Sequence, residues 1–149
     1  MRVRSVVGLV LFATVLPMLC GYGLVAAQAS SRVEPLGPGL VTVELTTRYS
    51  RFSTDEIVVR QGTLVRFVVT NEDPIHHEFI VGPPEVHAAH EAGHDLVHPP
   101  VPGEVAVDPG ETGLTTYLFD TPGTVEFACH LPGHLAYGMH GTVRVMATG

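Results

Sequence analysis

Short segments in which apolar and polar residues alternate constrain the fold of this 149-residue chain more than any other feature. In the first of them Val41, Val43 and Leu45 alternate with polar residues, which is the period of a half-buried β-strand. Seven more segments have strand-like composition, and turns rich in proline and glycine punctuate the series: 57–59, 64–70, 78–81, 104–107, 114–119, 125–128 and 141–146. Eight short strands with such punctuation predict an all-β sandwich or barrel.

A thiol, an imidazole and a thioether follow one another at equal spacing near the C-terminal end of the chain. Cys129, His134 and Met139 are each five residues apart. This donor set suits copper in both oxidation states, and a trigonal Cys/His/His site with a long axial Met is its electron-transfer form. The alternative is a buried structural thiol, because free cysteine is among the most buried residue types. A copper site needs a second histidine from elsewhere in the chain.

The segment 71–82 supplies this second histidine, because a turn rich in Asn, Asp and Pro runs there into a strand that carries His76 and His77. Neighbouring residues of a strand face opposite sides, so one of the two histidines faces the interior. A shift of one residue would exchange them.

With these residues in view, the chain resembles the cupredoxins, the small blue copper proteins, from about Phe52 to Val145. The triplet His77-Glu78-Phe79 is similar to the strand that carries the first histidine ligand of that family, and 57–71 is similar to its strand–Gly–strand–Asn opening. The Cys-x4-His-x4-Met spacing is similar to that of rusticyanin and longer than the plastocyanin loop.

The resemblance implies a Greek-key β-sandwich that holds one type 1 copper ion. In that arrangement His77, Cys129 and His134 are the equatorial ligands, and Met139 is the axial ligand. Of the two adjacent histidines, His77 fits the family pattern better than His76.

The N-terminal residues 1–29 have the layout of a secretory signal peptide. Arg2 and Arg4 precede a long apolar run, and small residues follow at Ala27 and Ala29. The run is about as long as a bilayer is thick, so an uncleaved anchor is the alternative and the one route to membrane contact. Residues 30–39 are expected to be a flexible lead-in, and 40–149 a single copper-binding domain. The predicted location is extracytoplasmic: periplasmic, secreted or tethered to the outer face of the membrane.

Charge excludes nucleic acid as a partner. After residue 29 the chain has six arginines and no lysine against fifteen acidic residues, a difference of −9. A basic stripe that would neutralise phosphates is missing. An acidic surface instead favours a partner with a basic docking patch.

Four histidines, His87, His90, His94 and His98, follow Pro84 at spacings that would place them on one face of a helix. Pro84 is expected to begin this helix and Pro99-Pro100 to end it, although Gly93 weakens it. Such a stripe is able to hold a second copper or zinc ion, to acquire metal or to sense pH. A solvated polar face on an insertion is the interpretation that we favour.

Two further histidines flank the predicted ligands. His130 follows Cys129, as in the His-Cys-His signature of multicopper oxidases, but Ala128 stands where that signature has its first histidine. We therefore expect no oxidase, and we expect His130 to lie behind the ligands or at the surface. His140 is expected at the surface.

The function predicted from these features is the transfer of single electrons between redox protein partners by an exported blue copper protein. The alternative is a copper-handling protein for resistance, storage or delivery, which would exchange the ion with copper-donor or copper-acceptor proteins; the histidine stripe supports it. An enzyme is not expected, because the sequence offers no nucleophile paired with a base, no phosphate-binding loop and no open metal triad.

Overall fold

The computed structural model describes residues 33–93 and 100–149. The predicted signal peptide lies outside the described residues, and so do His94 and His98. No helix in the described ranges is long and apolar enough to cross a bilayer.

All eight predicted strands are present, with ends that differ from the prediction by no more than two residues. Together with one short helix, α1 (Pro84–Glu91), they occur in this order: β1 (Gly39–Thr47), β2 (Glu56–Arg60), β3 (Thr63–Asn71), β4 (His77–Gly82), β5 (Glu104–Val107), β6 (Thr112–Phe119), β7 (Gly123–Ala128) and β8 (His140–Met146). The predicted all-β class is confirmed.

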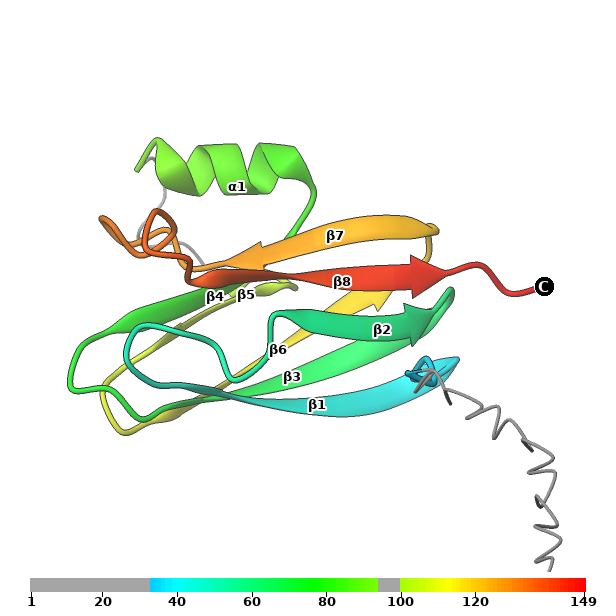
Figure 1. Cartoon of the computed structure of the whole chain (residues 1–149), viewed down its shortest axis with the longest axis horizontal. Helices are drawn as coiled ribbons and strands as arrows, with labels where there is room; N and C mark the ends of the chain where they lie inside the picture. Colours follow the sequence, from blue (N-terminus) through cyan, green and yellow to red (C-terminus); the bar gives the residue numbers. More distant parts are fainter. Residues whose placement is uncertain (1–32, 94–99) are drawn as a thin grey trace, which may run out of the picture. The chain divides into compact units, whose positions relative to one another are not determined.

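The strands form two sheets that face each other (Figure 1). One sheet has the order β1-β3-β6 and the other the order β2-β8-β7-β4-β5. The pairs β1/β3 and β2/β8 are parallel, and the remaining pairs are antiparallel. From β1 to β4 the chain changes sheet at every connection, which produces a sandwich rather than a meander.

Phenylalanine side chains fill the space between the sheets. In β3 the residues with odd numbers, including Phe67, are buried, as the alternation predicts. The Phe67 ring lies 4.8 Å from that of Phe79 in the other sheet, and Phe79 stacks on Phe127 of β7 at 5.5 Å. Burial of each such ring stabilises the fold by roughly 1.5–3 kcal/mol.

Strand β4 is buried along its whole length. It pairs with β5 on one side and with β7 on the other, and α1 packs against it. A strand covered in this way needs no polar face, and its first residue, His77, is held in the interior.

The helix begins where the sequence predicts and ends earlier. Pro84 occupies its first turn, but α1 ends at Glu91, before Gly93, whose φ of 69° places it in the left-handed region. The N–H of Gly93 donates to the carbonyl of His90 at 3.0 Å, which is a helix-terminating turn. The prediction that Pro99-Pro100 ends α1 is therefore wrong.

The flexible lead-in predicted for 30–39 also needs correction over its described part. Leu36 donates its N–H to the Val58 carbonyl at 2.9 Å and accepts from the N–H of Arg60 at 2.8 Å. These bonds extend the edge of β2, and β1 begins directly afterwards at Gly39.

Candidate metal centre

The loop between β7 and β8 folds back so that its two ends meet. The N–H of Cys129 donates to the carbonyl of Met139 at 3.0 Å, and the N–H of Met139 donates to the carbonyl of His134 at 3.0 Å. Gly133 and Gly138 have φ values of 86° and 87°, a conformation that glycine adopts without strain. The three predicted donors of this loop are thereby held close to one another through the backbone.

Three of the four predicted ligands bring their donor atoms together. His77 Nδ1 and Cys129 Sγ each lie 3.3 Å from His134 Nδ1, and all three donor atoms lie within 4.8 Å of one another. His77 and Cys129 are fully buried, whereas His134 is half-buried and forms the edge of the cluster. Met139 is also fully buried and is joined to Cys129 and His134 by the backbone bonds above.

A carboxylate fixes the orientation of the His77 ring. Asp73 Oδ2 lies 2.9 Å from His77 Nε2 and accepts its N–H, so Nδ1 keeps its lone pair on the side of Cys129 and His134. Histidines that bind metals commonly donate their other ring N–H to a carboxylate or a carbonyl in this way.

Asp73 is itself anchored by the backbone, and sequence reasoning gave it no role. Its two carboxylate oxygens accept the N–H groups of Tyr49 at 2.6 Å and Ser50 at 2.8 Å. Both donors have positive φ values, 55° and 52°, so the carboxylate holds a backbone turn that is unfavourable for these residue types. Burial acts to raise the pKa of Asp73, but the hydrogen bonds from Ser50, His77 and Tyr49 outweigh it and lower that pKa. The polar turn that precedes β4 is the sequence signal from which Asp73 could have been found.

Burial also changes the protonation of the predicted ligands in the metal-free protein. It raises the pKa of the Cys129 thiol to about 11, and the negative charge of Glu78 adds to the effect. It lowers the pKa of His134, with a further contribution from His77. The thiol is therefore protonated near neutral pH, and a metal that binds it must displace a proton, whereas the imidazole is ready to bind.

Among the described residues, the histidines that were not predicted as ligands include both exposed and buried side chains. His76 and His140 are exposed, and His76 pairs with Asp108 across 2.9 Å. His87 and His90 have exposures of only 6% and 8%, so the solvated polar face that we favoured for these two residues is wrong.

The side chain of His130 is buried beside His87 and His90, with 1% of it exposed, so a surface position is excluded. Its N–H donates to the carboxylate of Glu78 at 2.8 Å. Burial lowers the pKa of His130 to about 4, with contributions from His87 and His90. The hydrogen bond from the backbone N–H of His130 to Glu78 ties the loop between β7 and β8 to β4.

Comparison with protein families matches residues 41–146 to copper-binding proteins of the plastocyanin/azurin family. The chain belongs to this family. Copper is accordingly the metal of this cupredoxin, and the donor set of a thiol and two imidazoles fits it.

Three curated relatives of this cupredoxin are each named copper-resistant cuproprotein CopI. The protein of Rubrivivax gelatinosus is 41% identical over 64% of the chain, and the match spans 59% of that relative's length. The protein of Pseudomonas aeruginosa is 32% identical over 80% of the chain and 78% of the relative. The protein of Vibrio cholerae is 33% identical over 56% of the chain and 52% of the relative.

Solved structures share the sandwich. Auracyanin from Roseiflexus castenholzii superposes with a TM-score of 0.60 at 21% identity, covering 74% of this cupredoxin and 98% of that chain, and this likeness shows the fold alone. Auracyanin A of Chloroflexus aurantiacus, described as a "blue" copper protein, has a TM-score of 0.57 at 25% identity and covers 72% and 100% of the two chains. A multicopper oxidase matches at 18% identity over 40% of its length, which again shows only the fold.

Proposed function

We propose that this chain binds one copper ion in a type 1 site and handles copper for resistance outside the cytoplasm. His77, Cys129 and His134 are the equatorial ligands in this proposal, and Met139 is the weak axial one. The observation that carries the proposal is the buried cluster of His77, Cys129 and His134 in a chain whose relatives are named copper-resistant cuproproteins.

The donor set supports copper over other first-row metals. A thiolate and a thioether are soft ligands that select Cu(I), and imidazole suits Cu(II) as well, so the site holds the ion in either oxidation state. Bound copper supplies one-electron redox chemistry. Burial of Cys129 also protects the thiol, which would be prone to oxidation at an exposed position outside the cytoplasm.

The residues around the ligands have separate tasks in this proposal. Asp73 holds the His77 ring with Nδ1 toward the metal, and the bonds between Cys129, His134 and Met139 keep the loop closed. His134, the half-buried ligand, forms the edge through which copper enters or a partner makes contact.

Copper handling replaces electron transfer as the first candidate, because three relatives carry a copper-resistance name. Electron transfer is kept as the second candidate, since auracyanin A, a "blue" copper protein, has the same fold at 25% identity. Both functions would use the same four ligands.

The location and partners follow from the sequence and are part of the proposal. The predicted signal peptide directs the chain out of the cytoplasm, where copper-donor, copper-acceptor or redox proteins would meet it. The excess of acidic residues favours partners with a basic patch, through complementary steering.

Growth on copper tests this function. A host strain that lacks the gene should become more sensitive to copper, and the wild-type gene should restore tolerance. A Cys129→Ser variant should fail to restore it, whereas His76→Ala, which changes an exposed histidine, should succeed. Full tolerance with Cys129→Ser would refute copper handling at this site. Unchanged tolerance in the deletion strain, together with slowed electron transport, would favour the second candidate.

A further inference from the structure

Three histidines form a second buried cluster, separate from the predicted ligands. His87 and His90 project from α1, and His130 comes from the loop after β7. His87 Nδ1 lies 2.8 Å from His130 Nε2, and the two rings have centroids 5.1 Å apart. The His90 ring stacks on His130 at 6.0 Å with an angle of 27° between the planes. Segments about forty residues apart in the sequence thus bring three imidazoles together.

Hydrogen bonds determine which nitrogens carry protons in this cluster. His87 Nε2 lies 3.2 Å from the carbonyl of Glu126, which accepts only, so Nε2 bears the proton and Nδ1 of the neutral ring has a lone pair. The 2.8 Å contact then requires His130 Nε2 to donate. His130 Nδ1 is left as a buried lone pair, and no atom of the described residues forms a hydrogen bond with it.

We propose that His87 and His130 form a second metal site, which binds a further copper(II) ion between His87 Nδ1 and His130 Nε2. The metal takes the place of the shared proton, and that proton moves to Nδ1 of His130. The carboxylate of Glu91, whose Oε1 lies 3.9 Å from this nitrogen, then becomes its acceptor. No net proton is released in this exchange.

The two nitrogens already have the spacing that a copper(II) ion requires. Nitrogens at about 2.0–2.1 Å from the metal, in adjacent positions of the square-planar arrangement that copper(II) prefers, lie roughly 2.9 Å apart. The contact between His87 Nδ1 and His130 Nε2 is 2.8 Å, close to that value. In the metal-free protein the lone pair of His87 points along this contact, so both rings must turn to direct their lone pairs at the ion.

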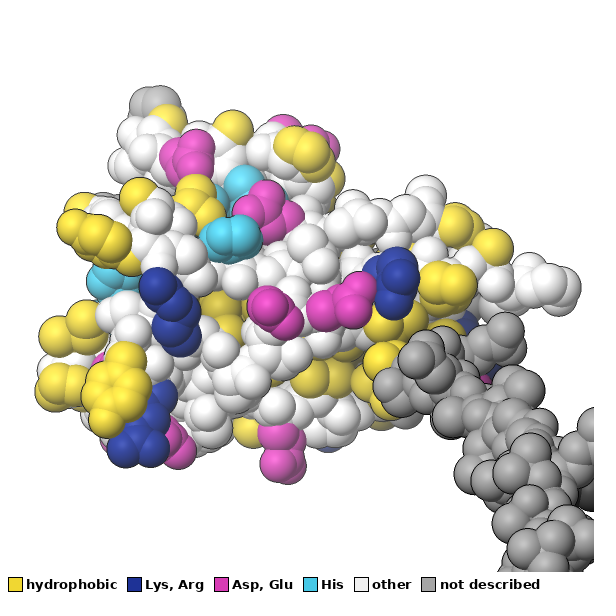
Figure 2. Space-filling view, in the orientation of Figure 1, with side chains coloured by type: hydrophobic (Ala, Val, Ile, Leu, Met, Phe, Trp, Pro, Cys, Tyr) yellow, Lys and Arg dark blue, Asp and Glu magenta, His cyan; other side chains and the backbone are white. Residues whose placement is uncertain are grey.

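Both rings already have the outer partners that metal-binding histidines use. His87 donates to a backbone carbonyl, and His130 has a carboxylate within reach. His90 is a third imidazole beside the pair, and its Nε2 lies 3.1 Å from Glu104 Oε2. Figure 2 shows histidine atoms at the surface just below α1, with acidic side chains beside them.

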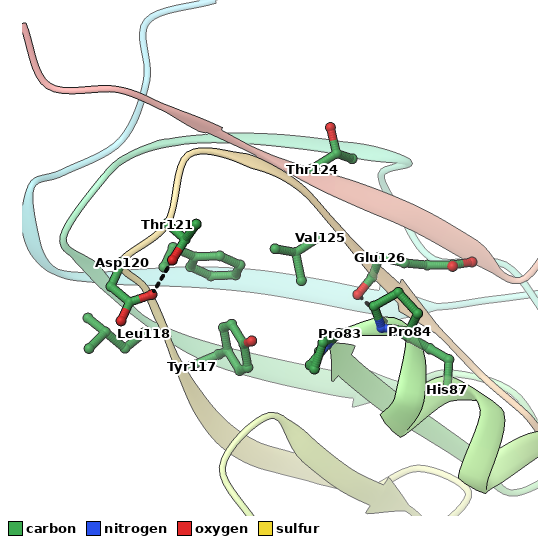
Figure 3. A pocket seen from close by; sticks show the side chains of 12 residues that line it. Pro83, Pro84, His87, Tyr117, Leu118, Asp120, Thr121, Thr124, Val125 and Glu126 are labelled. Carbon is green, nitrogen blue, oxygen red and sulfur yellow. Dashed lines mark hydrogen bonds between the residues drawn. The ribbon is translucent and has the colours of Figure 1, made fainter.

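A pocket of about 300 Å³ gives solvent access to His87. Figure 3 shows His87 and Glu126 at one end of the pocket and Asp120 at the other, with Pro83 and Tyr117 in the wall between them. Two acidic residues therefore line a path to an imidazole that is otherwise buried, and an incoming cation is attracted along it.

This inference rests on the proposed function, since a second ion is useful to a protein that captures copper and superfluous for a carrier of single electrons. Imidazole ligands without a thiolate suit copper(II) and zinc, so the second ion should bind without the intense colour of the first site.

Titration of the full chain tests the second site. Protein that holds one equivalent of copper, verified by its thiolate-to-copper absorption, is titrated with CuSO4 near neutral pH by calorimetry and electron paramagnetic resonance. The wild type should bind one further ion with nitrogen couplings and no new thiolate absorption. His87→Gln should weaken this step at least about 100-fold, because loss of an outer partner alone typically costs 10–100-fold. The control His76→Gln should bind the second ion as the wild type does.

A pair of glutamates on α1 provides a second comparison. Glu91→Gln, which removes the acceptor for His130 Nδ1, should weaken the second ion about 10–100-fold, whereas Glu85→Gln on the same helix should not. The absorption of the first equivalent reports that each variant is folded. X-ray absorption of zinc, added as ZnSO4 to the copper-loaded wild type, should show at least two imidazoles and no sulfur.

Each outcome decides one proposal. No second ion in the wild type, equal affinity in His87→Gln, or sulfur around the added zinc would refute the second site. Absence of thiolate absorption from the first equivalent would instead refute the type 1 site and leave the second site to be judged by its own titration.

Discussion

Replacement of Asp73 by alanine tests whether a single buried carboxylate supports both the sandwich and the metal centre. The carboxylate accepts hydrogen bonds from His77, Tyr49 and Ser50, and the residue is only 8% exposed. We expect Asp73→Ala to lower the free energy of unfolding of the metal-free protein and to weaken copper binding.

The size of the expected loss of stability follows from the three hydrogen bonds that the Asp73 carboxylate accepts. A hydrogen bond to a charged group contributes about 1.5–3 kcal/mol. The hydrogen bond to His77 is fully buried. In the Asp73→Ala variant, water takes part of the place of the carboxylate at Tyr49 and Ser50, so the free-energy contributions of the three hydrogen bonds do not add fully. The expected loss is about 3 kcal/mol, or roughly 10 °C in the midpoint of thermal unfolding. Copper affinity should fall about 10–100-fold, because His77 loses its orienting partner.

The pH dependence of the unfolding free energy tests the role of the Asp73 carboxylate independently. The pKa of Asp73 is lower in the folded protein than its ordinary value of 3.8, so the unfolded chain binds the proton first as pH falls. The stabilisation is therefore complete above about pH 4 and is lost below it, as pH falls through the folded pKa. The difference in unfolding free energy between the wild type and Asp73→Ala should be constant from pH 5 to 7 and shrink at lower pH.

Urea unfolding of the two proteins measures this difference, with Asp108→Ala as the matched control. Asp108 also pairs with a histidine across 2.9 Å, but its side chain is 75% exposed, so its loss should cost no more than about 1 kcal/mol. Equal losses of unfolding free energy in Asp73→Ala and Asp108→Ala would refute the reasoning. So would a difference between the wild type and Asp73→Ala that grows as the pH falls.

Three further predictions concern the ligands and the packing beside them. Cys129→Ser should abolish the thiolate-to-copper absorption while circular dichroism stays that of the folded sandwich, and a serine variant with the same colour would contradict the assignment. Met139→Leu should retain the colour and raise the reduction potential in voltammetry, because loss of a weak axial donor disfavours Cu(II) more than Cu(I); a lower potential would exclude Met139 as that donor. Gly141→Ala should destabilise the fold by about 1–3 kcal/mol in urea unfolding, because the added methyl group overlaps the ring of Phe127, whereas Gly82→Ala meets its nearest neighbour at an ordinary 3.4 Å and should be tolerated.

The strands were predictable because their signal is local. Alternation in 41–46 marks which side chains face the other sheet, and proline or glycine marks where the chain turns. The fully buried β4 has no alternation, and its strand-like composition after a polar turn located it instead.

What the sequence did not reveal depends on which surfaces meet after folding. His87 and His90 have polar side chains of a kind often found in water, and nothing in their spacing indicates that His130 and Glu126 would cover them. The role of Asp73 likewise depends on a turn at Tyr49 and Ser50, more than twenty residues away. Gly93 was a local signal for the end of α1, and the helical spacing of the histidines outweighed it in our prediction.

The closed loop between β7 and β8 allows the metal centre to change without a change in the strands that support it. Ala128 pairs with His140 in the strand ladder, and the Cys129–Met139 bond continues that ladder by one step, so the intervening residues leave and return at one point. Residues gained or lost within the loop leave the register of both strands unchanged, and doubling the length of a flexible loop costs only about 0.6 kcal/mol in closure entropy. A change in the length or sequence of this one segment is thus able to change metal geometry and partner choice while the sandwich keeps its stability.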